Sequence, residues 1–371
     1  MEPSEIRIPS DLLPGDGRFG SGPSKVRAEA VAALANSASG YLGTSHRKQG
    51  VRSVVGRLRS GLRDLFELPD DYEVVLGNGG TTVLWDALVF GLIRERSQHL
   101  VFGEFSSKFA HAAALALHLE EPEVVSAEPG DHPEPKGSEL VDVFALTHNE
   151  TSTGVAMPVT RVEGGLVAVD ATSAAGGLRV DPGDFDVYYF APQKGFASDG
   201  GLWVALCSPA AIERIQLLAD SDRYIPPSLD LLIALENSRQ NQTYNTPALA
   251  TLFLMVEQLE WILDNGGLEW SNGRCDRSAD ILYSWAEAHE QATPFVRDPA
   301  KRSHVVGTID LADGVDAPGI SAALRANGIV DTEPYRKLGR NQLRIAMYPA
   351  IEPDDIAQLT NCIDFAIDGL A

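Results

Sequence analysis

The sequence of 371 residues predicts an α/β protein with a large part built on a mostly parallel sheet and a smaller C-terminal α+β part. Short apolar runs recur through the first two thirds of the chain, and segments with helical spacing of apolar residues lie between several of them. After the glycine pair at 266–267, predicted strands and helices fill the last hundred or so residues of the chain. We therefore expect an N-terminal arm at 1–20, a large domain at 21–264 and a small domain at 265–371.

The apolar runs predict buried strands. Each run is short, consists mainly of apolar residues and ends in polar or glycine-rich residues, which is typical of a strand covered on both faces. The predicted strands are 73–77, 99–103, 141–146, 166–169, 187–191 and 202–206.

Three helices are expected between these strands. Apolar residues recur at helical spacing over 51–65, and similar patterns cover 82–93 and 105–117. The alternation of strand and helix predicts a parallel sheet. A long apolar helix at 247–263 follows, and Asn265 with the glycines after it is typical of a helix C-terminus.

The last hundred residues predict a compact α+β unit. Its strands and helices are expected at 269–288 (helix), 305–311 (strand), 318–326 (helix), 342–347 (strand) and from 352 onward (helix).

Composition excludes several classes of protein. A formal charge of −22 disfavours nucleic acid and anionic membranes as partners, and no apolar run reaches the roughly 18–20 residues that span a bilayer. The N-terminus lacks the basic and apolar segments of a secretory signal, and three widely spaced cysteines fit reduced thiols, so we expect a cytoplasmic protein. No histidine or cysteine cluster has the spacing of metal ligands, so no metal is expected.

The glycine-rich segment 76–82 joins a predicted strand to a predicted helix and could bind a phosphate group. Glycines let backbone N–H groups approach an anion, the helix dipole favours it, and the hydroxyls of Thr81 and Thr82 add donors. A plain turn with one of these threonines as N-cap fits the segment equally well. The spacing differs from dinucleotide-binding and P-loop motifs, which argues against both.

Lys194 and Asp170 each follow an apolar strand. An amine that is partly buried at such a position can attack a carbonyl and form a Schiff base, although an exposed turn lysine is the alternative. Ligands of open α/β sheets bind beyond the carboxyl ends of strands, where Asp170 can pair with the protonated ring nitrogen of pyridoxal phosphate. Capping of a loop or helix is the alternative for Asp170.

Three further segments contain groups that can bind anions: 43–47, 244–247 and 341–344. As an alternative, Thr246 can be the N-cap of a helix with Pro247 at its first position. Arg344 can also be a partner in a surface ion pair.

Together these segments resemble the class V, fold-type I pyridoxal phosphate-dependent enzymes, and among them the phosphoserine aminotransferase family. The resemblance covers nearly the whole chain. Its most specific parts occur in the order 45–47 (Ser-His-Arg), 149–151 (Asn-Glu-Thr), 191–194 (Ala-Pro-Gln-Lys) and 244–247 (Tyr-Asn-Thr-Pro). It implies the fold-type I architecture and transfer of an amino group from glutamate to 3-phosphohydroxypyruvate, which gives phosphoserine and 2-oxoglutarate in the serine pathway.

The resemblance also implies cofactor contacts. Lys194 would hold pyridoxal phosphate as a Schiff base, Asp170 would pair with its ring nitrogen, Phe105 would stack on the ring and Thr151 would bind the ring oxygen. The contacts implied for the cofactor phosphate are Gly80, Thr81, Thr82 and Gln193, with Asn245 and Thr246 supplied by a second subunit. The expected assembly is a homodimer with shared active sites.

For the substrates, the resemblance implies contacts from Ser21, His46 and Arg47, while Arg344 would bind the α-carboxylate through two parallel hydrogen bonds. Many relatives carry a His-Arg pair where this chain has residues 337–340. Lys337 and Arg340 are therefore candidates for the substrate phosphate, and Arg340→Ala is expected to affect the phosphorylated substrate more than glutamate.

Two alternative functions remain. One is another class V aminotransferase acting on alanine, serine or glyoxylate, which would keep Lys194 and Asp170 without needing Arg47. The other is a non-catalytic protein of the same fold that holds a phosphorylated metabolite. Cysteine desulfurase is disfavoured, because none of the three cysteines lies in a recognisable catalytic loop.

Overall fold

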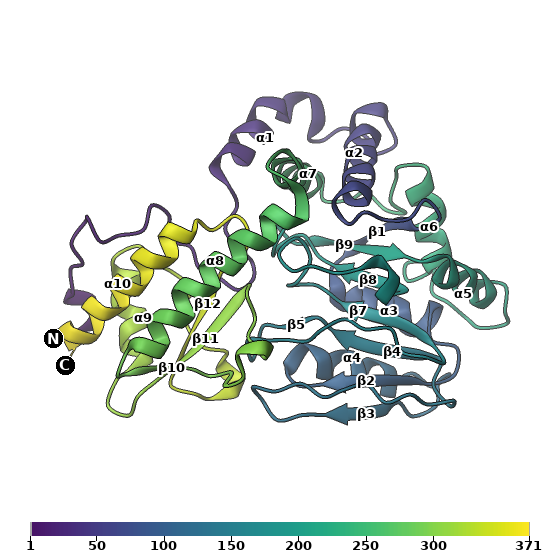
Figure 1. The fold of residues 1–371 in the computed structure, drawn as a ribbon. Helices are drawn as coiled ribbons and strands as arrows, with labels where there is room; N and C mark the ends of the chain where they lie inside the picture. Colours follow the sequence, from purple (N-terminus) through teal and green to yellow (C-terminus); the bar gives the residue numbers. More distant parts are fainter. Residues whose placement is uncertain (1, 371) are drawn as a thin grey trace.

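Helices cover both faces of a seven-stranded sheet in the computed structural model, which describes residues 2–370 (Figure 1). The strand order is β1-β9-β8-β7-β4-β2-β3. Only β9 is antiparallel to its neighbours, so the predicted α/β class with a mostly parallel sheet is confirmed. The strands are β1 Glu73–Gly79, β2 Ser97–Val101, β3 Glu123–Ser126, β4 Val143–Thr147, β7 Leu166–Asp170, β8 Val187–Phe190 and β9 Gly201–Cys207.

The central strands of the sheet are buried on both faces, which explains why they are mainly apolar runs. Successive residues of a strand point to opposite faces. Val74 packs in the core that contains α2 (Gln49–Leu65) and α7 (Leu249–Asp264), whereas Val75 packs in a second core. The helices of that second core are α3 Thr81–Gly91, α4 Glu104–Ala114, α5 Pro209–Ala219 and α6 Leu231–Arg239.

The predicted strands and helices all overlap observed elements, and some observed elements were not predicted. Strand β3 lies at the edge of the sheet and pairs only with β2, and its alternate residues are exposed, so it lacks the apolar run that marks the central strands. Helix α1 (Ala28–Tyr41) buries only Ala30 and Tyr41, which leaves it without a wide apolar face. Helices α5 and α6 were also missed.

A three-stranded antiparallel sheet forms beside the large one, with α8 (Gly267–Ala288) and α10 (Pro353–Leu370) packed together (Figure 1). Its strands are β10 (Ala292–Pro294), β11 (Val306–Leu311) and β12 (Gln342–Ala346), and α9 (Ala317–Ala326) lies between β11 and β12 along the chain. Gly266, at the α7–α8 junction, has a φ of 118°, a conformation that favours glycine. The division of the chain near this junction remains our proposal.

The N-terminal segment lies against the C-terminal unit, and both termini are at the same end of the molecule (Figure 1). Arg18 forms a parallel bridge with Val330, and the backbone N–H of Ala346 donates to the oxygen of Phe19 at 3.0 Å. These bonds fix the path of the chain immediately before Ser21 and Gly22, which lie near the cavity described below.

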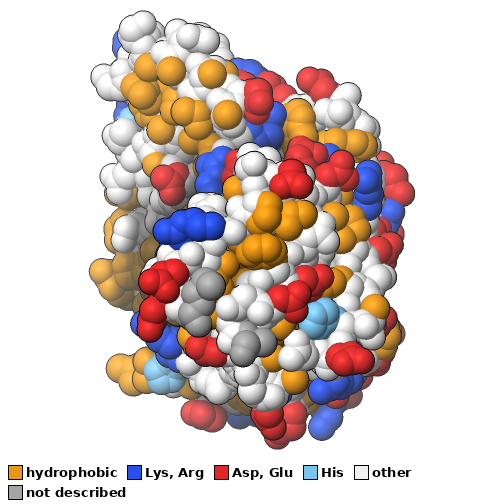
Figure 2. Space-filling view, turned by 90° about the vertical axis from the view of Figure 1, so that its left-hand side faces the viewer, with side chains coloured by type: hydrophobic (Ala, Val, Ile, Leu, Met, Phe, Trp, Pro, Cys, Tyr) orange, Lys and Arg blue, Asp and Glu red, His pale blue; other side chains and the backbone are white. Residues whose placement is uncertain are grey.

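The surface carries acidic and basic side chains side by side. Figure 2 shows one face, on which carboxylates and basic groups alternate with small apolar patches. Within residues 2–370, every helix falls short of the combined length and apolarity that a bilayer span requires.

Candidate active site

A cavity of about 390 Å³ lies beyond the carboxyl ends of β4 and β7 and at the start of α3. This is the position at which open α/β sheets bind their ligands. The predicted residues that line it are Thr81, Thr82, Phe105, Thr151, Asp170, Gln193 and Lys194. A larger and more open groove of about 730 Å³ elsewhere contains none of the predicted site residues.

Lys194 is buried, with 9% of its surface exposed, and its Nζ donates a hydrogen bond to the backbone oxygen of Ser21 at 2.7 Å. Burial lowers the pKa of its amine to about 8, and the nearby Arg344 acts in the same direction, whereas Asp170 and Glu150 oppose the shift. A much larger fraction of this amine is therefore uncharged near neutral pH than of an ordinary lysine, which makes it a competent nucleophile.

Gly22 gives Lys194 the space that it occupies. Its φ is +139°, and a Cβ atom added there would lie 2.6 Å from both Cε and Nζ of Lys194. The backbone can therefore pass the lysine this closely only with glycine at this position.

Asp170 is held by three donors. Trp85 Nε1 donates to its Oδ2 at 3.1 Å, and Thr172 donates to Oδ1 from its backbone N–H at 2.9 Å and from its hydroxyl at 2.6 Å. Burial raises the pKa of Asp170, and these hydrogen bonds partly offset the rise. A carboxylate fixed in this way suits a cationic ring nitrogen as its partner.

Trp85 and Thr172 are contacts of Asp170 that the sequence analysis missed. An Asp side chain often accepts a hydrogen bond from the backbone N–H two residues later. The contact between Asp170 and Thr172 could therefore have been predicted from the sequence. Trp85 belongs to the apolar pattern of α3, and only the packing of α3 against the sheet brings its indole to Asp170.

The start of α3 offers donors to an anion. Gly80 is the N-cap residue with extended backbone, and Thr81 and Thr82 are the first helical residues, whose N–H groups have no partner within the helix. Gly80 does not itself line the cavity. The side chain of Gln193 lines it, and its buried Oε1 has no hydrogen-bond partner among the described residues. An amide can present either oxygen or nitrogen by rotating, so this group is free to bind a ligand.

Arg344 lies on β12, close to the cavity. Its Nη1 donates to the backbone oxygen of Thr151 at 3.3 Å, and its guanidinium carbon lies 5.4 Å from the centre of the Tyr335 ring. Burial lowers its pKa, yet a guanidinium remains charged at neutral pH. Its buried Nε has no partner within residues 2–370, which leaves a donor available to a substrate carboxylate.

Besides Ser21, Gly80, Arg340 and Arg344, four more predicted residues do not line the cavity of their own chain: His46, Arg47, Asn245 and Thr246. We call them the outer cluster. The hydroxyl of Thr246 lies 3.2 Å from Nδ1 of His46, and Nη1 of Arg47 donates to Oε1 of Gln242 at 3.2 Å. Burial, followed by the charge of Arg47, lowers the pKa of His46. Arg47, Asn245 and Thr246 are exposed.

The structure gives Arg340 and Lys337 partners other than the predicted substrate phosphate. Arg340 donates to both carboxylate oxygens of Asp310, at 3.0 and 2.6 Å, and lies over the Phe295 ring. Lys337 pairs with Glu104 at 2.5 Å. Neither Lys337 nor Arg340 lines the cavity of this chain, and their contact with the substrate phosphate stays a prediction. Asp310 lies on β11, 30 residues before Arg340, and only the fold brings the two side chains together. The sequence alone therefore could not show that Asp310 is a partner of Arg340.

The sequence profile of the family described as Aminotransferase class-V matches residues 19–332. A putative phosphoserine aminotransferase of Mycobacterium leprae is 59% identical over 368 residues, which are 98% of each chain. A phosphoserine aminotransferase of Nocardioides sp. is 60% identical over 370 residues, 98% of this chain and 99% of that one.

Solved structures share the fold. A phosphoserine aminotransferase of Cytophaga hutchinsonii superposes with a TM-score of 0.87 at 24% identity, covering 94% of this chain and 99% of that one. An aspartate aminotransferase of Thermus thermophilus reaches 0.82 at 24% identity, covering 95% and 99%. At these identities the likeness concerns the fold, and it does not distinguish the substrates. The family profile and the full-length relatives lead to one conclusion: this chain belongs to the class V aminotransferase family.

Proposed function

We propose that this chain is a pyridoxal phosphate-dependent phosphoserine aminotransferase. It transfers the amino group of glutamate to 3-phosphohydroxypyruvate and yields phosphoserine and 2-oxoglutarate. The observation that carries the proposal is the presence of Lys194 and Asp170 in one cavity of a chain whose relatives, 59–60% identical over nearly its whole length, bear that name.

The residues of the cavity fit the cofactor. The start of α3 at Thr81 and Thr82, with the free amide of Gln193, suits its phosphate, and Phe105 offers a ring for stacking. Asp170 suits the ring nitrogen, and Thr151 suits the ring oxygen. When bound, pyridoxal phosphate provides an electron sink for negative charge that develops at the α-carbon of the substrate.

The protein groups divide the remaining work. Arg344 binds the α-carboxylate and thereby orients the α-carbon. The neutral amine of Lys194 removes the α-proton, and burial supports this role because it lowers the pKa of the amine to about 8. Trp85 and Thr172 keep the carboxylate of Asp170 in place, so that its negative charge stays beside the ring nitrogen.

The assembly belongs to the same proposal. The outer cluster is displaced from the cavity of its own chain and carries anion-binding groups. A homodimer in which each chain inserts this cluster into the site of the other would bring Asn245 and Thr246 to the cofactor phosphate and His46 and Arg47 to the anionic end of the substrate. Ser21 stays a proposed substrate contact. Its backbone oxygen accepts from Lys194, which places the residue beside the reactive amine, and its buried hydroxyl has no partner among the described residues. We place the enzyme in the cytoplasm, where its three buried thiols would stay reduced.

The proposal is tested by borohydride reduction of the purified protein after incubation with pyridoxal phosphate. A mass shift is expected on the peptide that contains Lys194 and is expected to be absent in Lys194→Ala, whose turnover should fall by at least about a thousandfold. Lys301→Ala is a matched control, because Lys301 pairs with Asp131 and does not line the cavity. A reduced adduct on another lysine would contradict the assignment.

Substrate choice is tested in the same preparation. With glutamate as donor, turnover of 3-phosphohydroxypyruvate is expected to exceed turnover of pyruvate and glyoxylate. Preference for either unphosphorylated acceptor would favour the alanine or serine-glyoxylate alternative. A protein that forms no adduct and turns over none of these acids would be the non-catalytic alternative.

A further inference from the structure

Glu150 is a carboxylate that the reaction described above does not use. It lies on the short strand β5 (Asn149–Glu150), and its surface is 0% exposed. Its hydrogen bonds come from backbone N–H groups and serine hydroxyls rather than from a paired cation. Burying a carboxylate is costly unless its oxygens are satisfied, so the position of Glu150 requires a reason.

One oxygen of Glu150 caps the start of α4. Its Oε2 accepts from the backbone N–H groups of Phe105 and Ser106, both at 3.0 Å. These are N–H groups of the first helical turn, which have no acceptor within the helix, and the helix dipole favours a negative charge there. The carboxylate therefore fixes the backbone from which the Phe105 ring projects.

The other oxygen holds the chain immediately after Thr151. Oε1 accepts from the backbone N–H of Ser152 at 3.2 Å and from its hydroxyl at 2.7 Å. The same hydroxyl accepts from the backbone N–H of Glu104 at 3.0 Å, which closes the network. Two segments that both reach the cavity, one through Phe105 and one through Thr151, thus share a single carboxylate.

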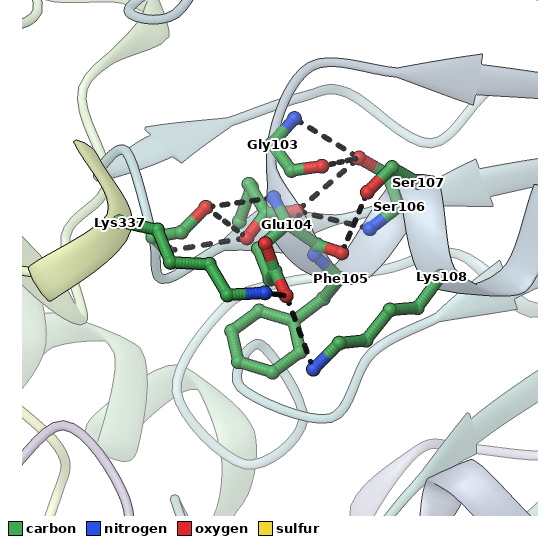
Figure 3. A network of polar contacts seen from close by, with 9 residues as sticks. Gly103, Glu104, Phe105, Ser106, Ser107, Lys108 and Lys337 are labelled. Atoms are coloured by element: carbon green, nitrogen blue, oxygen red, sulfur yellow. Dashed lines mark hydrogen bonds and ion pairs between the residues drawn. The ribbon is translucent and has the colours of Figure 1, made fainter.

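The contact between the two segments is close. A Cβ atom at Gly103 would lie 2.3 Å from Cγ of Glu150, so only glycine allows this approach. Figure 3 shows the start of α4, where the Glu104 carboxylate meets Lys337 on one side and Lys108 on the other, near the Phe105 ring. These pairs measure 2.5 and 3.3 Å. Exposed ion pairs of Glu104 and buried hydrogen bonds of Glu150 therefore both hold the start of α4.

We propose that Glu150 is a positioning residue for the cofactor, because its one carboxylate sets the spacing between the Phe105 ring and Thr151. This inference rests on the proposed function. A glutamine at 150 would keep the size of the side chain but offer one acceptor oxygen, and its NH₂ group would face the N–H groups of α4 or of Ser152. One of the two segments would then lose its tether.

Charge provides a second readout. The groups that act on Lys194 are Arg344 of β12, which lowers its pKa, and Asp170 of β7 and Glu150 of β5, which raise it. Removing the charge of Glu150 is therefore expected to lower the pKa of Lys194 further. Asp142, the control described next, is not among the groups that act on Lys194, so removing its charge is expected to leave that pKa unchanged.

Asp142 provides a matched control for Glu150. It is also buried and accepts from three backbone N–H groups, those of Arg94, Glu95 and Arg96, at 2.7–2.9 Å. It differs from Glu150 in that it pairs with Arg214 at 2.8 Å and does not line the cavity. Both Glu150→Gln and Asp142→Asn are expected to lower the unfolding temperature of the apoprotein.

The test is titration of the two apoproteins with pyridoxal phosphate, followed by absorbance. Only Glu150→Gln is expected to raise the dissociation constant of the cofactor, by about tenfold, which corresponds to the loss of one such tether. Only this variant is expected to change the absorption band of the bound cofactor and to shift the midpoint of the pH dependence of cofactor capture to lower pH.

Ser152→Ala keeps the test valid if Glu150→Gln fails to fold. It removes only the hydroxyl bonded to Oε1 and is expected to weaken cofactor binding by a smaller factor with a normal fold. Equal cofactor affinity and equal spectra for Glu150→Gln, or for Ser152→Ala in its place, and Asp142→Asn would overturn the inference. Failure of the parent protein to bind pyridoxal phosphate would instead overturn the proposed function.

Discussion

At the scale of single residues, the proposed chemistry depends on one amine and one carboxylate. Their surroundings shift the two pKa values in opposite directions. Burial lowers the pKa of Lys194 and raises that of Asp170, because in each case it disfavours the charged form. The two groups lie in a cavity whose other lining groups include hydroxyls, amides and the ring of Phe105. Perturbed titratable groups that converge in a cavity are typical of active sites.

The pH dependence of cofactor capture tests the acidity of Lys194. The neutral amine is the attacking form and predominates above its pKa, so the rate at which apoprotein captures pyridoxal phosphate is expected to rise with pH and level off above about 8. Stopped-flow absorbance measures this rate. A midpoint near 10.5, the ordinary value for lysine, would contradict the effect of burial.

Arg340→Ala separates two interpretations of a second residue. The arginine is 44% exposed and paired with Asp310, so its loss is expected to cost at most about 1 kcal/mol of unfolding free energy. We expect the apparent KM values for glutamate and 3-phosphohydroxypyruvate to stay within about twofold of the parent, because Arg340 does not line the cavity. A rise confined to the phosphorylated substrate would restore the interpretation made from the sequence.

At the scale of elements, the site is assembled where strands end and helices begin. Strand β7 ends at Asp170, and α3 begins at Thr81, so the carboxylate and the anion-binding helix start face the same cavity. The N-terminal segment adds Gly22 and the backbone oxygen of Ser21, which binds Lys194. The lysine is therefore held by a segment that itself is bonded to the C-terminal unit.

Gly22→Ala tests this arrangement. The new methyl group would lie 2.6 Å from Nζ of Lys194, so adduct formation is expected to fall by at least about tenfold, in addition to backbone strain of about 1 kcal/mol. Gly314→Ala serves as the control, since Gly314 also has a positive φ, +97°, but has open space around its Cβ position. Borohydride trapping and thermal unfolding measure the two effects. Similar trapping by both variants would show that the close approach is unimportant.

At the scale of the whole molecule, the proposed homodimer would complete each site with residues of two chains. The outer cluster joins residues far apart in the sequence, at 46–47 and 245–246, on the surface of one chain. Its anion-binding groups are absent from the lining of that chain's own cavity. In a dimer with two-fold symmetry, the same contact occurs twice. Each outer cluster would then lie against the cavity of the partner subunit.

Mixing two inactive variants tests the shared site. Lys194→Ala lacks the amine and Arg47→Ala lacks the proposed anion contact, so each homodimer is expected to be nearly inactive. After unfolding and refolding together, half of the dimers would be mixed, each with one intact site, which restores about a quarter of the parent activity. Each variant refolded alone is the control. No recovery in mixed dimers of demonstrated composition would place Arg47 and Lys194 of one chain in the same site. An active Arg47→Ala homodimer would instead remove Arg47 from the reaction.

The sequence by itself determined the α/β class, the positions of the central strands, and the places of Asp170 and Lys194 at or just after the ends of two strands. These features are local, because burial on both faces makes a strand apolar throughout, and a polar residue directly after such a strand lies at the edge of the sheet. Tertiary structure decided the partners of those groups. Trp85 reaches Asp170 across 85 residues, Glu150 reaches Phe105 across 45, and Arg340 is paired with Asp310. Hydrogen bonds of this kind depend on how helices and strands pack together, and no spacing along the chain encodes that packing.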